Sequence, residues 1–308
     1  MSSKVVIKDK KYTGSYSRMA VAIQQVAGKI DTTPSGLYEQ QIVIKTGDVT
    51  IKNSELDVEF NIPFDDDTEA NEAEIVIYNL TDNTINAMKK NAAISITAGY
   101  SKDTGVIFSG YIKKKKTVWE DCDKVTTIYA IDNNGKEERE LTELAYGSGT
   151  KASTILRKLV GNVGLPLAVF QTKRDHTYKD KVTVSGGLMD NIKKYAQICG
   201  VVAYVCKSKI YVCPLTYGNN TTLNLTSDTG LLSVSEFEER IQAEDYTDIV
   251  NGLEVEMLLQ HRVQTGSILN ITTRNLKGDY RVREGTHVYD GDTFKTVVKA
   301  ISYSCIKK

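Results

Sequence analysis

The sequence predicts an α+β fold that is predominantly β, with a small α/β module between two β domains. Apolar and polar residues alternate from Leu56 to Ile62, which is the period-two pattern of a strand with one solvent-facing side. Between residues 146 and 215 apolar residues recur at helical spacing instead, and strand-like segments return from residue 216 onward. These changes divide the 308 residues into an N-terminal extension (1–36), a first β domain (37–145), the module (146–215) and a second β domain (216–308).

The composition is that of a globular protein with a buried core. Apolar residues make up 41% of the chain and charged residues 25%, and 39 basic residues balance 39 acidic ones. A net charge of zero gives no support for free nucleic-acid binding, which needs an excess of Lys and Arg. Five scattered cysteines without a Cys-x-x-Cys pair predict folding in a reducing cytoplasm. Neither a secretory signal nor an apolar run of membrane-spanning length is visible.

The first β domain is predicted mainly from the segment 74–131. One strand ends at Tyr78, and Thr81 follows at the position of a helix N-cap, ahead of a short helix over residues 82–90. Further strands are predicted over residues 94–100, 106–112 and 126–131, before a turn at 133–135.

In the module, two helices and a hairpin are predicted. Thr150 is the expected N-cap of the first helix and Gly161 its end, and Gly200 ends the second helix. The two apolar helix faces comprise Ala152, Ile155, Leu156, Leu159 and Val160 in the first helix, and Leu188, Ile192, Tyr195, Ala196 and Cys199 in the second. Strands over 201–205 and 210–213 then form a hairpin across Lys207-Ser208.

The second β domain is predicted as a series of strands. The candidates cover residues 248–257, 262–265, 268–273, 279–282 and 294–302. The acidic stretch from Ser235 to Ala243 precedes them, and we expect it to form a loop or a short helix.

No catalytic motif has the spacing that its chemistry needs. Gly147-Ser148-Gly149-Thr150-Lys151 is similar to a phosphate-binding loop, but Thr150 separates the Gly from the Lys, so helix capping by Thr150 is favoured. The three histidines lack the spacing of a zinc site. We expect His176 in an exposed loop and His287 in a strand near a turn.

The cysteines and acidic clusters also favour structural interpretations, so no metal or cofactor site is predicted. Cys199, Cys206 and Cys213 recur every seven residues, yet they fall on a helix face and on a hairpin, which indicates buried free thiols. The run Asp65-Asp66-Asp67 lacks the Gly and the closing Glu of a calcium loop and is interpreted as a turn. Glu236 and its acidic neighbours favour a solvated loop over a glycosidase pair.

The run Lys113–Lys116 directly follows a predicted strand. Binding of nucleic acid or of an anionic surface is less favoured, because the protein as a whole is neutral. A charged edge that blocks unwanted strand pairing is one alternative, and the rim or lining of a channel is another. Both of these alternatives stay open at this point.

The strongest functional indication is the order of several weak motifs. Tyr78-Asn79-Leu80-Thr81, a helical turn, Ala98-Gly99-Tyr100 and Phe108-Ser109-Gly110-Tyr111 come first. Gly149-Thr150-Lys151-Ala152 follows with its helix, and Gly278-Asp279-Tyr280-Arg281-Val282, Thr286-His287 and Gly291-Asp292-Thr293-Phe294 close the series. This order covers most of the chain after residue 40. It resembles the late control protein D-like baseplate hub proteins, which join the tail tube to the spike in contractile phage tails and phage-tail-like bacteriocins.

The resemblance implies a ring-forming homotrimer with two tube-like β-barrel domains in each chain. Six similar β units would then adapt a sixfold tail tube to a threefold central spike, without catalysis and without a cofactor. The family motifs assign structural roles to eight residues: Asn79, Leu80, Gly99, Tyr100, Gly110, Gly149, Thr150 and His287.

The partners that the resemblance implies are the tail tube protein, the central spike protein and other baseplate proteins. Neither membrane insertion nor sequence-specific nucleic-acid binding is expected, although DNA would cross the channel if the particle is a phage. The expected location is the baseplate of a phage or phage-tail-like particle that is assembled in the bacterial host cytoplasm.

Two other functions are open alternatives to a baseplate hub. A tail-associated cell-wall hydrolase would have to carry its catalytic groups in the module at residues 146–215, where no nucleophile and base pair is seen. A glycan-binding protein at the tail tip is the second alternative.

Overall fold

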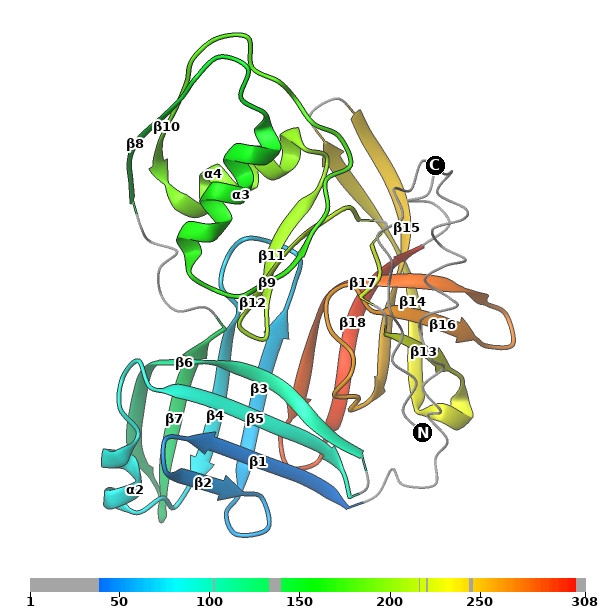
Figure 1. The fold of residues 1–308 in the computed structure, drawn as a ribbon. Helices are drawn as coiled ribbons and strands as arrows, with labels where there is room; N and C mark the ends of the chain where they lie inside the picture. Colours follow the sequence, from blue (N-terminus) through cyan, green and yellow to red (C-terminus); the bar gives the residue numbers. More distant parts are fainter. Residues whose placement is uncertain are drawn as a thin grey trace, which may run out of the picture.

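A computed structural model describes residues 39–101, 103–132, 140–215, 217–219, 221–243 and 246–302 (Figure 1). The predicted N-terminal extension and the predicted turn at 133–135 lie outside these residues. The fold is predominantly β, as predicted. The helices among the described residues are α2 (Asp82–Ala87), α3 (Ala152–Val163), α4 (Leu188–Ile198) and the 3-10 turn η1 (Ser227–Thr229). None of them is long and apolar enough to cross a membrane.

The strands fall into three consecutive groups, which we call the first β region, the middle module and the second β region. The first β region holds β1 (Gln40–Thr46), β2 (Val49–Lys52), β3 (Val58–Phe64), β4 (Glu72–Tyr78), β5 (Ala93–Tyr100), β6 (Asp103–Glu120) and β7 (Asp123–Ile131). The middle module holds β8 (Glu140–Tyr146), β9 (Leu167–Phe170), β10 (Val182–Gly187), β11 (Val202–Cys206) and β12 (Lys209–Cys213). The second β region holds β13 (Thr222–Leu225), β14 (Leu231–Ala243), β15 (Tyr246–Leu258), β16 (Ile268–Thr272), β17 (Lys277–Tyr289) and β18 (Phe294–Ser302).

One 13-stranded sheet runs through both β regions. Its main path is β14-β15-β18-β17-β3-β4-β7-β6-β5-β1-β2, with β16 beside β17 and β13 beside β16. The antiparallel pair β17–β3 joins the two regions, from Gly285 opposite Phe64 to Tyr289 opposite Phe60. Since this path has two ends, the separate barrels expected from the sequence are not seen as closed barrels among the described residues. The two regions share one open sheet instead.

Each β region nevertheless has its own apolar core. The alternation predicted around β3 is confirmed, because Val58, Phe60 and Ile62 are buried while the residues between them face outward. The core of the first region also includes Leu259 and Phe294, which come from the second region. Burial of a side chain of this size contributes roughly 1.5–3 kcal/mol, so the shared core helps to hold the two regions together.

The middle module packs two helices against one face of the sheet β11-β12-β9. Both predicted apolar helix faces are buried, and the predicted hairpin turns at Lys207-Ser208, whose φ angles are 49° and 58°. The opposite face of this sheet carries Tyr204, Cys206 and Cys213, and these cysteines are buried free thiols as predicted. The module stands above the first β region in Figure 1.

The sequence-based expectation fails for two segments of the second β region. Ser235–Ala243 belongs to strand β14 because it pairs residue by residue with β15, and such pairing overrides a local preference for a loop. Arg262–Thr265 forms no strand. It lies in a loop with two tight turns, in which Val263 N donates to Gln260 O at 3.0 Å and Ser267 N donates to Gln264 O at 3.0 Å.

The end of helix α3 also differs from the prediction. The helix continues past Gly161 to Val163 and ends at Gly164, whose φ of 76° is left-handed. Glycine adopts that conformation without the steric cost that a Cβ atom would add, so Gly164 is the better terminator.

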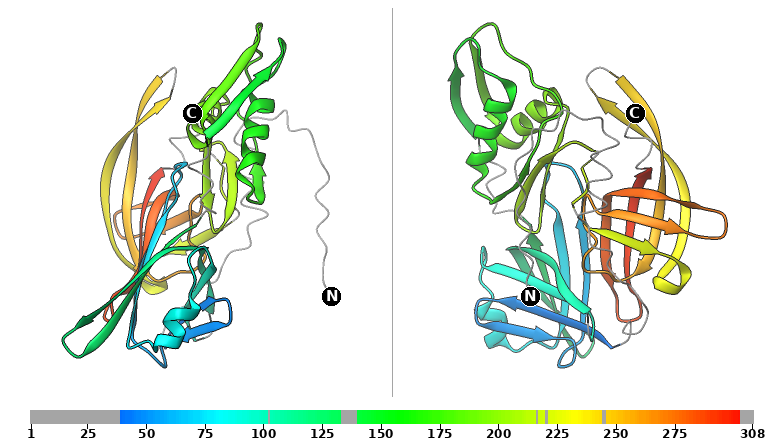
Figure 2. Two further views of the ribbon diagram at one scale, coloured as in Figure 1. Left: turned by 90° about the vertical axis from the view of Figure 1, so that its left-hand side faces the viewer. Right: turned by 45° about the vertical axis from the view of Figure 1, so that its right-hand side comes forward.

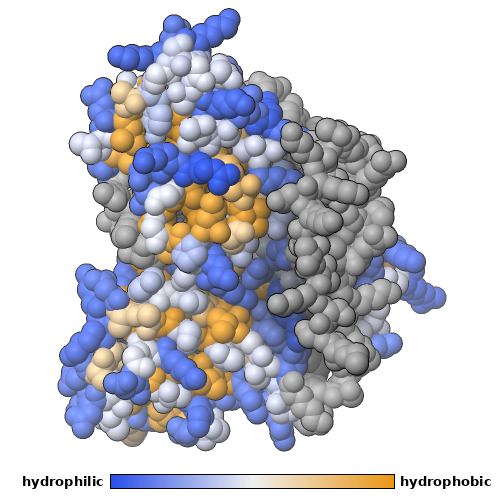
Figure 3. Space-filling view, in the orientation of Figure 1, coloured by the Kyte–Doolittle hydropathy of each residue, from blue (hydrophilic) through white to orange (hydrophobic). Residues whose placement is uncertain are grey.

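Two β-ribbons extend from the body of the molecule, namely the β6–β7 hairpin and the β14–β15 pair (Figure 2). On the face shown in Figure 3, apolar residues gather over the middle module and over the first β region, with polar residues around them. Among the described residues the most exposed large apolar side chains are Val106, Trp119, Leu167 and Leu232, and the most exposed of these is Trp119 at 69%.

Candidate functional site

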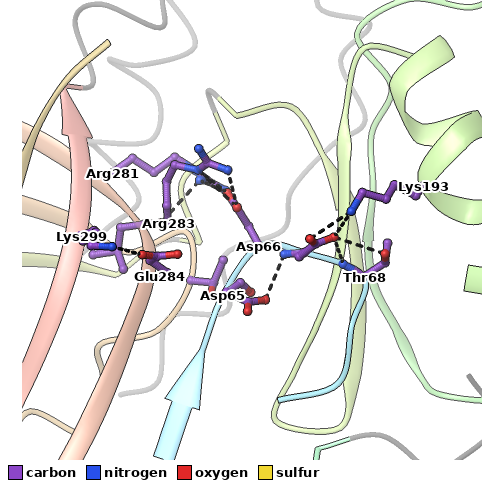
Figure 4. A network of polar contacts seen from close by, with 11 residues as sticks. Asp65, Asp66, Thr68, Lys193, Arg281, Arg283, Glu284 and Lys299 are labelled. Carbon is purple, nitrogen blue, oxygen red and sulfur yellow. Dashed lines mark hydrogen bonds and ion pairs between the residues drawn. The ribbon is translucent and has the colours of Figure 1, made fainter. Parts of the chain in front are cut away.

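The candidate site is the junction at which the first β region, the second β region and the middle module meet (Figure 4). Its centre is the loop after β3, where Asp66 has a side chain only 6% exposed. Asp66 Oδ2 lies 3.1 Å from Arg281 Nη1, and Asp66 Oδ1 lies 2.8 Å from Arg283 Nη2. Two strand-borne guanidinium groups therefore hold one buried carboxylate from the other β region.

Arg281 is the most deeply buried charged side chain of this junction, with no measurable exposure. Its Nε also donates to the carbonyl oxygen of Tyr217 at 3.0 Å. A buried charge is tolerated only when it is paired and hydrogen-bonded. The position of the Asp66 loop relative to β17 is therefore tightly specified.

The next residue in the loop reaches the middle module. Both carboxylate oxygens of Asp67 accept hydrogen bonds from Lys193 Nζ in helix α4, at 2.9 and 3.0 Å. Burial raises the pKa of Asp67, but the hydrogen bonds from Lys193 and Thr68 outweigh it and leave the pKa below its usual value. Because both side chains are nearly half exposed, this pair orients the module more than it stabilises it.

The tip of the β11–β12 hairpin makes a second contact with both β regions. Ser208 Oγ donates to the carbonyl oxygen of Ser109 in β6 at 2.7 Å, and Lys207 Nζ donates to that of His261 at 3.1 Å. Lys207 also lines a small pocket between the regions together with Cys206 and His287. Burial lowers the pKa of Lys207. The tip thus sits between the two β regions and touches each of them.

A third contact ties the β5–β6 turn to the loop after β15. Arg262 donates from both terminal nitrogens to the two carboxylate oxygens of Asp103, each at 2.5 Å. The neighbouring His261 packs its ring against the backbone of Gly105, where any side chain would collide with it. Burial lowers the pKa of His261 to about 4, with the positive charge of Arg262 acting in the same direction.

Two of the predicted family-motif residues fix the end of β4. Asn79 is left-handed with a φ of 57°, its Nδ2 donates to Asp123 Oδ1 at 2.8 Å, and its Oδ1 accepts from Lys124 N at 3.0 Å. Leu80 is buried in the first core. Thr81 caps α2 as predicted, because its hydroxyl accepts from Thr84 N at 3.2 Å.

Three further motif residues support the first core and its contact with the second region. Gly99 and Gly110 lie against backbone carbonyl groups of Asp103 and Ile131, which leave no room for a Cβ atom. Tyr100 packs edge-on against Phe294 of β18, with ring centroids 5.3 Å apart. This motif tyrosine therefore takes part in the contact between the two β regions.

Thr150 does not cap helix α3, contrary to the prediction. The N-cap is Lys151, and Thr150 Oγ1 donates to the carbonyl oxygen of Gly147 at 2.7 Å. The first amide groups of the helix are bound from a distant loop instead. Ser153 N donates to Asp175 Oδ1 at 3.0 Å, and Ala152 N donates to the carbonyl oxygen of His176 at 2.8 Å. Gly149 lies in the preceding turn with a φ of 81°.

His287 is a strand residue near a turn, as predicted. It is fully buried and lies in the seam between β17 and β3, opposite Ile62. Its Nδ1 lies 2.9 Å from Thr296 Oγ1. Burial lowers the pKa of His287 to about 3, and the nearby Lys207 adds to the effect. The ring is therefore neutral near neutral pH and acts as part of the core. His176, in contrast, is exposed in a loop, as predicted.

The eight motif residues do not form one site, and sequence reasoning missed the residues that do. The sequence predicts Asp66 only as part of a turn and Arg281 only as part of a strand motif. The available signal was Arg281-Val282-Arg283, an arginine pair at strand spacing, which places both guanidinium groups on one face of a strand. No group of three His, Cys, Asp or Glu side chains suited to a metal ion occurs in the described ranges. The arrangement fixes three regions relative to one another.

Comparison with known proteins agrees with this architecture. The sequence model of the baseplate hub gp41 family matches residues 40–284. No curated protein matches the chain in a sequence search.

Three solved structures share the fold over most of both chains. The tail protein from Neisseria meningitidis MC58 is 10% identical, with a TM-score of 0.65 and coverage of 88% of this chain and 98% of that one. The 43 kDa tail protein of prophage MuSo2 from Shewanella oneidensis is 8% identical, with a TM-score of 0.61 and coverage of 87% and 99%. The E. coli c3393 protein, a type VI secretion system component similar to the T4 tail proteins gp27 and gp5, is 11% identical, with a TM-score of 0.60 and coverage of 85% and 77%.

Proposed function

Because the chain belongs to the baseplate hub gp41 family, we propose that it is a structural hub subunit that joins a sixfold tail tube to a threefold central spike without catalysis. The observation that carries this proposal is the seam between β17 and β3, which fuses two β regions of one chain into a single sheet. One chain therefore presents two β units side by side. Three such chains in a ring present six units above and a threefold arrangement below.

The polar junction supports the same role. A symmetry adaptor must keep its two β units in a fixed relation while it is loaded by the tube and the spike. The buried group of Asp66, Arg281 and Arg283 fixes the Asp66 loop against β17, and the hairpin tip at Lys207-Ser208 fixes the middle module to both regions. Each contact is directional, so the geometry is specified as well as stabilised.

In this role the chain acts as a homotrimer in the baseplate of a phage or phage-tail-like particle, assembled in the bacterial host cytoplasm. Its partners are the tail tube protein, the central spike protein and other baseplate proteins. Each contact between chains would bury roughly 2,000 Å² or more in total, as obligate interfaces do.

The test is electron microscopy of the purified full chain, alone and co-expressed with the spike and tail tube proteins of the same particle. We expect threefold rings with a central channel and six similar outer lobes, capped by the spike on one side and by the tube on the other. Rings that bind neither partner would contradict the adaptor role. Particles that stay monomeric with both partners present would overturn the proposal altogether.

A further inference from the structure

Two strands near opposite ends of the main sheet have an open edge among the described residues. Strand β14 pairs only with β15, so its other edge is unpaired along its length. Strand β6 is paired with β5 only up to Tyr111, and from Lys113 to Glu120 its pairing is with β7 alone. A protein normally protects such edges, because free backbone groups recruit a further strand.

The two edges carry opposite charge. Lys114 and Lys116 are exposed and lie two residues apart, hence on one face of β6. Glu236 and Glu238 are exposed and lie on one face of β14 in the same way. Two copies of the lysine edge would repel each other, and so would two copies of the glutamate edge, whereas one lysine edge and one glutamate edge attract.

The other two lysines of the run already have intramolecular roles. Lys113 Nζ lies 2.9 Å from Glu72 Oε2. Lys115 Nζ binds the carbonyl oxygens of Ile85 and Met88 at the end of α2. Lys114 Nζ lies over the ring of Tyr129, its cross-strand neighbour in β7, 4.1 Å from the ring centroid, and the residue stays exposed.

The directions of β14 and β6 also allow strand pairing between two copies of the chain. The path from β14 to β6 contains eight strands, and each neighbouring pair is antiparallel. An even number of alternating strands places β14 and β6 in opposite directions. In a cyclic ring the β14 of the next copy keeps the direction of the first, so it meets β6 antiparallel. The chain makes the same kind of joint internally, at β17–β3.

Two of the four most exposed large apolar side chains lie on these strands. Trp119 is 69% exposed in the open part of β6, and Leu232 is 53% exposed in β14. Exposed aromatic side chains beside an open strand edge are typical of surfaces that a partner covers.

From these observations we propose that β6 from Lys113 to Glu120 of one copy pairs antiparallel with β14 of the next copy, with Lys114 opposite Glu238 and Lys116 opposite Glu236. The occupant of each edge is thus a second copy of this chain. The inference rests on the proposed hub function and adds to it the surface that closes the ring. It also assigns the lysine run to an interface.

The test reverses the charges and then restores their complementarity. Four forms of the full chain are co-expressed with the spike protein: wild type, K114E/K116E, E236K/E238K, and the combination of all four changes. Sedimentation velocity and native mass spectrometry measure the fraction of trimer over a dilution series. We expect each double variant to weaken assembly at least tenfold and the fourfold variant to recover to within about threefold of wild type.

Lys158 and Lys194 are exposed on α3 and α4. The control variant K158E/K194E therefore has the same change in net charge as K114E/K116E. This control should assemble like wild type, and circular dichroism should show all variants folded. The fluorescence of Trp119, the sole tryptophan, should shift to shorter wavelength on assembly. Threefold rings that form equally well in all variants would overturn the edge pairing and leave the hub function standing. A wild-type chain that never assembles with the spike would overturn both.

Discussion

Asp66 and Arg281 lie 215 positions apart in the sequence, yet the carboxylate of one and the guanidinium of the other meet at 3.1 Å with both side chains nearly inaccessible to solvent. The pair crosses the seam between the two β regions. Replacing such a pair with apolar residues often costs little, whereas removing only one partner leaves a charge buried and unpaired. The pair therefore specifies how the regions meet.

Asp66→Asn should be among the most destabilising single changes at the junction. It removes the charge that balances Arg281 and Arg283, so the free energy of unfolding should fall by about 3–5 kcal/mol. Asp67→Asn is the matched control, because its pair with Lys193 is nearly half exposed and should contribute less than about 1 kcal/mol. Urea unfolding followed by circular dichroism gives both values. Equal losses for the two variants would show that burial of Asp66 has no energetic importance.

Stability should also depend on pH through the buried His287 and the partly exposed His261. The pKa of His261 is lowered to about 4 and that of His287 to about 3, from a usual value of 6.5. The unfolded chain therefore binds more protons than the folded chain below pH 6.5. The free energy of unfolding therefore keeps its full value above pH 6.5. It falls as the pH drops below 6.5, until the folded-state pKa values of about 4 for His261 and about 3 for His287 are passed.

Thermal unfolding between pH 7 and pH 4 measures this effect. Each histidine should cost roughly 1.4 kcal/mol per pH unit below 6.5, until its folded-state pKa is reached. His287→Phe should flatten the slope even if it changes the stability at pH 7. The lowered pKa of Asp103 and of Asp67 acts below their usual value of 3.8, whereas burial raises the pKa of Asp65, which acts above that value with the opposite sign. The difference in slope between wild type and His287→Phe therefore identifies the histidine contribution. An unchanged slope in His287→Phe would contradict the assignment.

Local patterns were sufficient to predict the middle module and much of the first β region. The faces of α3 and α4 follow from apolar spacing, and the cap at Thr81 follows from residue type and position. The turn at Lys207-Ser208 was located because two apolar strands flank it, although both of its residues are left-handed without being glycine. In each case the partners lie within a few residues, where sequence periodicity records them.

No local pattern predicts which distant segments meet at the junction. The seam pairs Asn61 with Val288, and no local pattern links two such distant strands. The acidic segment of β14 is a strand because β15 lies beside it, so its own composition was misleading. The N-terminus of α3 is bound by Asp175, which is 22 residues from Ser153, and the nearby Thr150 was the wrong choice for that reason. The seam, the strand β14 and the N-terminus of α3 all depend on contacts between segments that are far apart in the sequence.

The cap of α3 can be tested with a pair of substitutions. Asp175→Ala removes the oxygens that accept hydrogen bonds from Ser153 N and Ser153 Oγ, at 3.0 and 2.6 Å. We expect a loss of about 0.5–2 kcal/mol in the free energy of unfolding, as for other lost caps. Thr150→Ala is the comparison, because its hydroxyl bonds only to Gly147 O outside the helix and should cost less. A larger loss in Thr150→Ala, measured by urea unfolding, would restore the original cap assignment.

Phe294 brings an aromatic side chain of the second β region into the core of the first. It comes from β18 but lies in the core of the first β region, edge-on to both Tyr100 and Tyr289 at 5.3 and 5.4 Å between ring centroids. Phe294→Ala should therefore cost about 3–5 kcal/mol, because it leaves a cavity between regions that no neighbouring strand closes. Phe294→Leu keeps most of the volume and should cost less than about 1.5 kcal/mol.

A seam residue differs from an ordinary core residue in which strands lose local stability when it is replaced. In Phe294→Ala, hydrogen exchange of the β3 and β17 amides should accelerate more than that of β5 or β15, because β3 and β17 form the only ladder between the two regions in the described part of the chain. Leu232→Ala removes an exposed side chain of the second region and should change stability by less than about 0.5 kcal/mol. If exchange in Phe294→Ala rose uniformly over both regions, the seam would unfold only with the whole protein, and the two regions would act as one cooperative unit.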